Sequence, residues 1–176
     1  MSFRSPNIRP ARVEDADAIG RIHVLSWQAA YADALPAEFL RTLSVQGRQD
    51  RWRDRLAATD RAVRVLVVVD NATVVGFECV GPSRDDAASP EVGELQNIYL
   101  DPAKWGQGLG TALHDEGLNT LRQDGYTSAT LWVLDSNGRA RRFYERAGWT
   151  FDGVTKVDTI ADSPPVTEVR YRRALR

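Results

Sequence analysis

The segment from Asn97 to Thr111 constrains the fold of this chain more than any other, because an extended stretch in it leads into a glycine-rich turn and a helix start. Its residues are Asn-Ile-Tyr-Leu-Asp-Pro at 97–102 and Trp-Gly-Gln-Gly-Leu-Gly-Thr at 105–111. Alternate glycines let the backbone approach a ligand closely and tolerate a positive φ, while a helix start offers unpaired N–H groups and a positive dipole end to an anion. The segment therefore predicts a phosphate-binding turn, and the expected ligand carries a pyrophosphate.

Two common nucleotide-binding turns do not match this segment. A P-loop has Lys followed by Ser or Thr after its last glycine, and no such pair follows Gly110; a dinucleotide-binding turn has glycine where Thr111 stands. The hexapeptide 105–110 instead resembles the acetyl-CoA signature Arg/Gln-x-x-Gly-x-Gly/Ala of the GNAT superfamily of N-acetyltransferases. Trp105 departs from the usual Arg or Gln, but phosphate contacts at this turn are expected to come largely from the main chain.

A second stretch resembles the other half of the same family's core. Residues 130–149 predict a strand, then Asn137, then a helix that carries Tyr144, then Gly148 and an aromatic residue. The opening at 8–19 is similar to the family's usual first strand and first helix. Two independent matches in the right order are stronger evidence than one, and the resemblance covers almost the whole chain.

Length and charge favour one domain without a bulk polyanionic partner. With 176 residues the chain can bury a substantial core, so we expect 1–176 to form a single domain. Lys and Arg total 23 against 24 Asp and Glu, so the near-neutral balance gives no argument for nucleic acid or an anionic membrane as a bulk partner, and neither is expected. The basic run 139–146 is an exception: most of its arginines are interpreted as a solvated helix face, with one or two near the phosphates.

The use of cysteine favours a cytoplasmic protein. Cys79 is the single cysteine, which excludes an internal disulfide, and no segment has the apolar length of a membrane span or the pattern of a signal peptide. Cys79 lies in the apolar run 74–80, where a buried and inert thiol is the expected state.

Hydrophobic periodicity and turn residues predict an α/β domain. Helices are predicted over 14–31, 36–43, 46–58, 108–123 and 137–147. Strands are predicted over 7–10, 63–69, 73–80, 91–100, 127–134, 149–157 and 166–172, with polar loops at 81–90 and 158–165. Hairpins at both ends flank one strand-helix-strand crossover, so the expected sheet is mixed, mainly antiparallel and flanked by helices. The GNAT fold has this architecture, with a cleft where its fourth and fifth strands splay apart.

The resemblance implies acetyl-CoA as the cosubstrate and no metal. It places the pantetheine amides against the backbone of Ile98, Tyr99 and Leu100. It places the pyrophosphate at the N–H groups of the turn, which belong to Gly106, Gln107, Gly108, Leu109, Gly110 and Thr111. Asn137 is expected to cap the following helix, since Asn is a favoured N-cap, and to contact the pantetheine portion.

Acetyl transfer to an amine requires the amine to lose a proton, so a general base is expected. A lysine-like amine has a pKa near 10.4, and holding it neutral at pH 7 costs about 4.6 kcal/mol. The candidates are Glu94, on the strand that leads to the glycine turn, and Glu78, on the strand before it. Glu94 is favoured because the family often draws its base from this strand; a partly exposed strand carboxylate is the alternative for both. Some members carry a glutamate five residues before the motif asparagine, but Trp132 occupies that position.

Tyr144 is the second catalytic candidate. It stands seven positions after Asn137, as the family's tyrosine does, and the resemblance implies that its phenol protonates the departing CoA thiolate or positions the thioester sulfur. Packing is the alternative, because Ala140, Phe143 and Ala147 form a helical stripe with Tyr144.

The sequence defines the residues of the acceptor pocket less clearly than those of the acetyl-CoA site. Residues of the first helix commonly border the acceptor pocket in this family, so Trp27 and Tyr31 are expected there, with core packing and loop packing as their respective alternatives, whereas His23 is more simply a core residue. Glu78, which could face the cleft from its strand, is expected in the same pocket. No compact acidic cluster indicates a polycationic acceptor.

Together these motifs predict an acetyl-CoA-dependent N-acetyltransferase that acetylates a primary amine of a small molecule or peptide. Direct attack is expected, because Cys79 does not suit a covalent enzyme intermediate. The alternatives are transfer of another acyl group and a catalytically silent acyl-CoA-binding sensor, which binds CoA but releases no thiol. A homodimer is a further expectation, from family habit and the apolar last strand.

Overall fold

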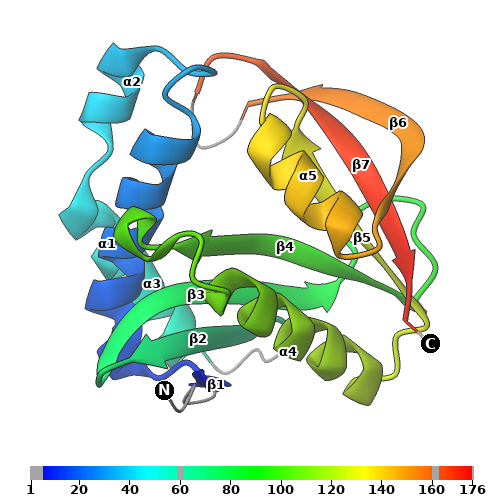
Figure 1. Ribbon diagram of the computed structural model, residues 1–176, viewed down its shortest axis with the longest axis horizontal. Coiled ribbons are helices and arrows are strands. Elements are labelled where there is room, and N and C mark those ends of the chain that lie inside the picture. The colour runs from blue at the N-terminus through cyan, green and yellow to red at the C-terminus, as the bar shows by residue number, and fades with distance from the viewer. Residues whose placement is uncertain (1–5, 59–61, 160–162, 176) are drawn as a thin grey trace.

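A computed structural model describes residues 6–58, 62–159 and 163–175, which form a seven-stranded sheet with helices on both faces (Figure 1). The strands are β1 (Asn7–Pro10), β2 (Arg64–Asp70), β3 (Thr73–Pro82), β4 (Val92–Leu100), β5 (Ser128–Leu134), β6 (Thr150–Asp158) and β7 (Val166–Ala174). The helices are α1 (Ala16–Ala30), α2 (Ala37–Thr42), α3 (Val45–Ala57), α4 (Leu109–Gln123) and α5 (Gly138–Arg146). Each predicted helix and strand occurs with ends shifted by at most two residues, although residues 160–162 of the predicted loop 158–165 lie outside the described residues.

The strands lie in the order β1-β2-β3-β4-β5-β7-β6. Neighbouring strands are antiparallel except β4 and β5, which are parallel and joined through α4. The prediction of a mixed, mainly antiparallel sheet is therefore confirmed. The hairpin predicted between β2 and β3 is also present, and its two central residues, Asn71 and Ala72, have φ of 47° and 62°, as a tight two-residue turn requires.

The alternation of side chains along β3 divides the core into two layers. Phe77 and Cys79 face α1 and α3, where they pack with Ile19 and Trp52. Their neighbours face the opposite side, where Val80 packs with the apolar face of α4. Cys79 is fully buried, and burial raises the pKa of its thiol to about 12. The expectation of an enclosed thiol is confirmed.

The sheet opens between β4 and β5. These strands pair only over Val92–Glu94 and Ser128–Thr130; further on, β4 continues along β3 and β5 continues along β7. A bulge at Gln96, which has no partner between the pairs Cys79–Asn97 and Val80–Leu95, bends β4 at this point. The edge of β4 that follows Glu94 therefore borders a gap instead of a strand.

The last strand, β7, lies between β5 and β6, so both of its edges are paired. An apolar last strand thus gives no support to a homodimer, which stays a prediction. Among the described helices, none is long and apolar enough to cross a membrane.

Candidate active site

A cavity of about 1450 Å³ extends from the gap between β4 and β5. It exceeds the roughly 300–1000 Å³ of common small-molecule pockets. One group of lining residues comes from the glycine turn and the start of α5, and another comes from α1, β6 and β7. The cavity is thus lined on one side by helix N-termini, which can bind an anion, and on the other by aromatic and charged side chains.

The glycine turn lines this cavity with an open backbone. Gly106 and Gly108 have φ of 75° and 78°, and Gly108 is the N-cap of α4. A Cβ added at either glycine would meet no heavy atom within 4 Å, so a side chain there would be strained and would fill free space. Gly110 and Thr111 also line the cavity. The arrangement fits a phosphate held by N–H groups at a helix start.

Two residues of the turn direct their side chains elsewhere. The Gln107 amide nitrogen lies 3.3 Å from the Ala103 carbonyl oxygen, and Leu109 packs against the apolar cluster under α4. Their expected role involves only backbone N–H groups, so it stays a prediction.

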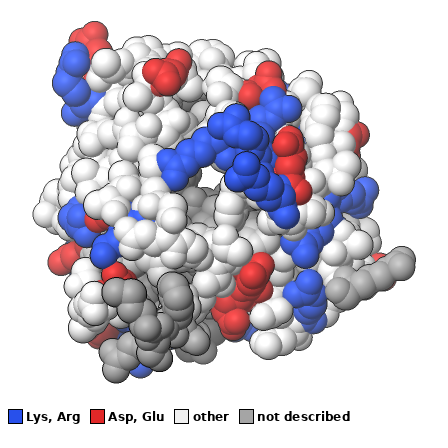
Figure 2. Space-filling model, in the orientation of Figure 1, with Lys and Arg blue, Asp and Glu red and all other residues white. Residues whose placement is uncertain are grey.

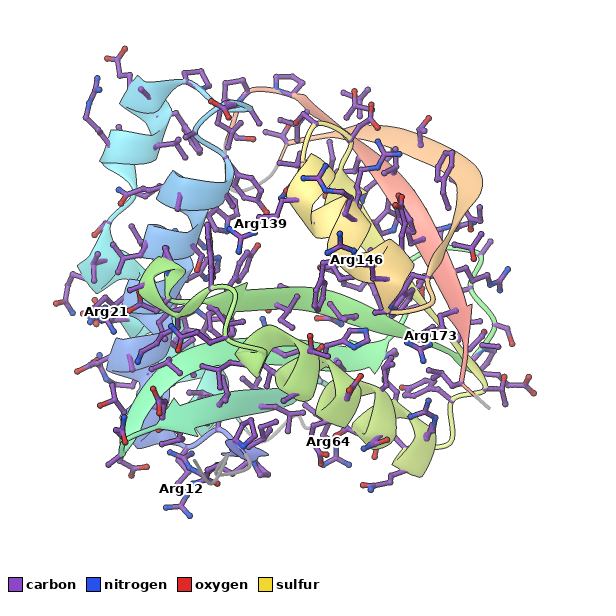
Figure 3. The ribbon with its side chains drawn as sticks, in the orientation of Figure 1. Arg12, Arg21, Arg64, Arg139, Arg146 and Arg173 are labelled. Atoms are coloured by element: carbon purple, nitrogen blue, oxygen red, sulfur yellow. The ribbon has the colours of Figure 1, made fainter. Side chains whose placement is uncertain are left out.

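Polar contacts hold the loop before α4 in place. Asp101 accepts a hydrogen bond from the Ala103 N–H (3.0 Å) and pairs with Arg21 of α1 (3.2 Å), which reaches toward this loop in Figure 3. The Leu100 carbonyl accepts from Ser26 Oγ (2.7 Å) and Trp105 Nε1 (3.2 Å). Because that carbonyl already has two donors, a pantetheine arm would pair with the other backbone groups of 98–100.

The start of α5 lines the same cavity as the start of α4. Asn137 Oδ1 accepts a hydrogen bond from the Ala140 N–H at 3.1 Å, so its expected N-cap role is confirmed. Asn137 also lines the cavity. Two helix N-termini, each with a positive dipole end, therefore border one space.

Arginines from α5 form a basic rim beside these helix starts. Arg139, Arg142 and Arg146 line the cavity, and Figure 2 shows Lys and Arg side chains gathered at the edge of the hollow. The Arg139 guanidinium lies 3.7 Å from the centre of the Trp105 ring and so links α5 to the glycine turn (Figure 3). Trp105, which stands where the motif has Arg or Gln, thus stacks with an arginine from another helix. Three arginines of the basic run 139–146 line the cavity, whereas the sequence predicted one or two near the phosphates.

Tyr144 lies at the inner wall of the cavity. Its side chain is buried and packs against Phe143 and Trp149. Within the described ranges its hydroxyl has no hydrogen-bond partner and is not a fully enclosed atom, so it opens to the cavity. Burial, reinforced by Tyr99 and Glu78, raises the pKa of Tyr144 above its ordinary value of 10.0. The phenol is therefore protonated at neutral pH, as a proton donor must be.

Glu94 is fully buried at the point where β4 and β5 part, and it lines the cavity. Its Oε2 accepts from the Arg84 N–H at 2.7 Å, and its Oε1 accepts from Arg84 Nε at 3.0 Å and from a second guanidinium nitrogen. The alternative of a solvent-exposed carboxylate is thus excluded. Arg84 fixes the carboxylate, whose oxygens keep further lone pairs for a proton.

Glu78 lies outside the cavity, so its expected place in the acceptor pocket is wrong. Its carboxylate faces α4 at Gly117, where an added Cβ would come within 2.2 Å of Oε2. Among the described residues neither oxygen has a hydrogen-bond partner, and burial raises the pKa well above 4.5. The strand was predicted correctly, but the side chain points to the packed face of the sheet.

Aromatic side chains form one wall of the cavity. Trp27 and Tyr31 line the cavity with their rings 5.2 Å apart, and burial raises the pKa of Tyr31 well above its ordinary value. His23 and Tyr99 stack at 5.1 Å and line it as well. His23 was expected to be a core residue; its half-buried ring lies against the core residues Trp52 and Phe77 and also lines the cavity.

Sequence reasoning missed a set of charged residues on the other wall. Lys156 lies 4.4 Å from the Trp132 ring centre and 3.3 Å from Glu168 Oε2. These three residues and Arg84 line the cavity. Trp132 was identifiable by its place five residues before Asn137, but β6 and β7 carry no local signal for the other contacts. Among the described residues, no group of three or more His, Cys, Asp or Glu is placed to hold a metal ion.

Residues 24–149 match the acetyltransferase (GNAT) family. An uncharacterized N-acetyltransferase of Bacillus subtilis (strain 168), YuaI, is 34% identical over 131 residues, which cover 74% of this chain and 72% of that protein. Mycothiol acetyltransferase of Rhodococcus erythropolis is 35% identical over 80 residues, which cover 46% of this chain and 27% of that enzyme.

Solved structures share the whole fold at low identity. PaiA N-acetyltransferase from Thermoplasma acidophilum, in complex with coenzyme A, superposes with a TM-score of 0.75 at 18% identity and covers 97% of this chain and 99% of that one. YncA from Salmonella typhimurium, solved with its cofactor acetyl-CoA, superposes with a TM-score of 0.72 at 21% identity and covers 98% of this chain and 95% of that one. The predicted fold class is confirmed.

Proposed function

The chain belongs to the acetyltransferase (GNAT) family and is an acyl-CoA-dependent N-acetyltransferase, and from this premise we propose that it acetylates a primary amine of a small molecule or peptide by direct attack. One observation carries the proposal. A single cavity joins an anion-binding turn to an aromatic and charged wall through the gap between β4 and β5.

The lining residues divide between the two substrates. The turn at 106–111 and the N-cap Asn137 hold the pyrophosphate and pantetheine portions of acetyl-CoA, which supplies the activated acetyl thioester. The arginines at 139, 142 and 146 complement the remaining phosphate charge. The free edge of β4 pairs with the pantetheine amides, as a strand would.

Two residues move the protons. Glu94 takes a proton from the acceptor amine, directly or through water, and the amine nitrogen then bonds to the acetyl carbonyl carbon. The carbon–sulfur bond breaks, and the Tyr144 hydroxyl gives its proton to the departing thiolate. The nitrogen loses its second proton as the amide forms, and this proton restores the Tyr144 phenol. Cys79 takes no part, because its thiol is fully buried and its pKa is raised to about 12, so no acetyl-enzyme forms.

Release of CoA thiol with a panel of amines tests the proposal. Wild type should release thiol with at least one amine, and Tyr144→Phe should lower kcat by about 100-fold with little change in the KM for acetyl-CoA. Tyr126→Phe is the matched control, because it removes a hydroxyl from a half-buried tyrosine outside the cavity lining. Binding of acetyl-CoA without thiol release would instead identify a silent sensor, and an unchanged kcat in Tyr144→Phe would remove this residue from the mechanism.

A further inference from the structure

Each of the two histidines accepts a hydrogen bond from a tryptophan. Trp52 Nε1 lies 3.1 Å from His23 Nδ1, and Trp149 Nε1 lies 2.9 Å from His114 Nε2. An indole N–H can only donate, so the accepting ring nitrogen carries no proton. The two rings therefore hold opposite tautomers, with the proton on Nε2 in His23 and on Nδ1 in His114.

The same surroundings keep His23 neutral. Burial lowers its pKa to about 3, and Arg48 and Arg55 act in the same direction. Nδ1 of the neutral ring accepts the Trp52 hydrogen bond and Nε2 already carries the proton, so His23 cannot take a proton from a substrate. It offers only a fixed N–H donor.

That donor opens to the acceptor side of the cavity. His23 lines the cavity, with Tyr99 stacked on its ring. Within the part of the chain that the structure describes, Nε2 has no hydrogen-bond partner and is not an enclosed atom. Arg48 lines the same wall, 5.5 Å from the centre of the Trp27 ring. A donor beside a guanidinium repels an ammonium group and favours an anionic oxygen.

We propose that His23 selects acceptor amines that carry a carboxylate, by donating its Nε2–H to a carboxylate oxygen, and that Trp52 is the positioning residue that fixes this proton. The acceptor class is thus an amino acid or a peptide with a nearby free carboxylate. This inference rests on the proposed function, since it requires an amine acceptor to bind beside α1.

The tautomers of His23 and His114 can be measured without an activity assay. Long-range proton–nitrogen NMR of the ¹⁵N-labelled full chain should show at pH 7 one neutral ring protonated at Nε2 and one at Nδ1, with the His23 ring unchanged from pH 7 to pH 5. Trp52→Phe should leave the His23 ring neutral but let its proton divide between Nδ1 and Nε2, because the donor to Nδ1 is lost, while the matched variant Trp149→Phe should affect only His114. A His23 ring protonated at Nδ1, or charged at pH 6, would overturn the assignment.

Selectivity is then measured with matched sets of an amino acid, its amide and its decarboxylated amine. Wild type should prefer the carboxylate member in kcat/KM by about 10- to 100-fold, as for a hydrogen bond to a charged group. His23→Phe should remove the preference while keeping an aromatic ring. Trp52→Phe should weaken the preference, because part of the His23 population then carries its proton on Nδ1, whereas Trp149→Phe should keep the preference of wild type.

The outcomes separate the two proposals. Acetylation of amines without a carboxylate preference would overturn the role of His23 and leave the proposed function intact. Absence of thiol release with every amine would contradict the proposed function, and with it the acceptor selection, while the tautomer measurement would still stand.

Discussion

Glu78 and Glu94 lie on adjacent strands and are both fully buried, yet their surroundings differ. Glu94 borders the cavity, and Arg84 donates to both of its oxygens. Glu78 faces Gly117 of α4, and neither of its oxygens has a partner among the described residues. The difference teaches that burial alone does not identify a reactive carboxylate. A reactive carboxylate must also line the cavity in which the substrate binds.

Matched substitutions of the two glutamates should separate them most clearly. Glu94→Gln removes the proposed base and should lower kcat by at least about 100-fold, equivalent to about 2.7 kcal/mol. Glu78→Gln changes a side chain outside the cavity and should alter kcat by less than about threefold. Steady-state kinetics of both purified variants, with circular dichroism to verify folding, provide the measurement. The reverse ranking would contradict the assignment of Glu94.

The packing around Glu78 gives the next largest effect. Gly117→Ala places a methyl group 2.2 Å from Glu78 Oε2, and such overpacking should cost about 2 kcal/mol of unfolding free energy. Gly110→Ala is the control on the same helix, because its Cβ would meet only Leu100 Cδ1 at an ordinary 3.5 Å. Urea unfolding measures both, and equal stability of the two variants would show that Glu78 does not pack under α4.

The pH dependence of stability gives the smallest effect when it is expressed for each pH unit. Burial raises the pKa of Glu78 well above 4.5, so the folded chain holds this proton more tightly than the unfolded chain does. The stability that this proton contributes is complete below about pH 4.5 and declines as pH rises toward the folded pKa, by at most about 1.4 kcal/mol per pH unit. Glu78→Gln lacks this decline, so its stability relative to wild type should rise with pH.

Urea unfolding of both proteins from pH 4 to pH 8 gives this difference. The histidines affect wild type and variant alike: their pKa values are lowered by burial, so both proteins lose stability below about pH 6.5. A difference that does not change with pH would show that the folded structure leaves the pKa of Glu78 near its ordinary value.

The fold was largely predictable because its signals are local. Glycines at 106 and 108 with positive φ, Asn137 as an N-cap and the β-branched runs of β2 and β3 each determine their own segment. Their order along the chain then restricts the sheet to one parallel pair among antiparallel ones.

The candidate site was predictable only in part, because its side chains meet across distant strands. The direction of Glu78 depends on the register of β3 against its neighbours, and a shift of one residue would have turned it to the other face. Arg84 lies in a loop and Glu168 in the last strand, and no spacing in the sequence relates either to Glu94. Likewise, the bond from Trp52 to His23 joins α3 to α1, and residue type alone does not predict it.

The central claim is that the glycine turn binds the phosphates of acetyl-CoA, and calorimetric titration of wild type, Gly108→Asp and Gly125→Asp tests it most directly. Both glycines have a positive φ, and a Cβ added at either meets no heavy atom within 4 Å, so the two substitutions carry the same kind of backbone strain. Only Gly108 lines the cavity. We predict that wild type and Gly125→Asp bind acetyl-CoA and that Gly108→Asp does not; equal binding by all three proteins, or no binding by wild type, would contradict the account.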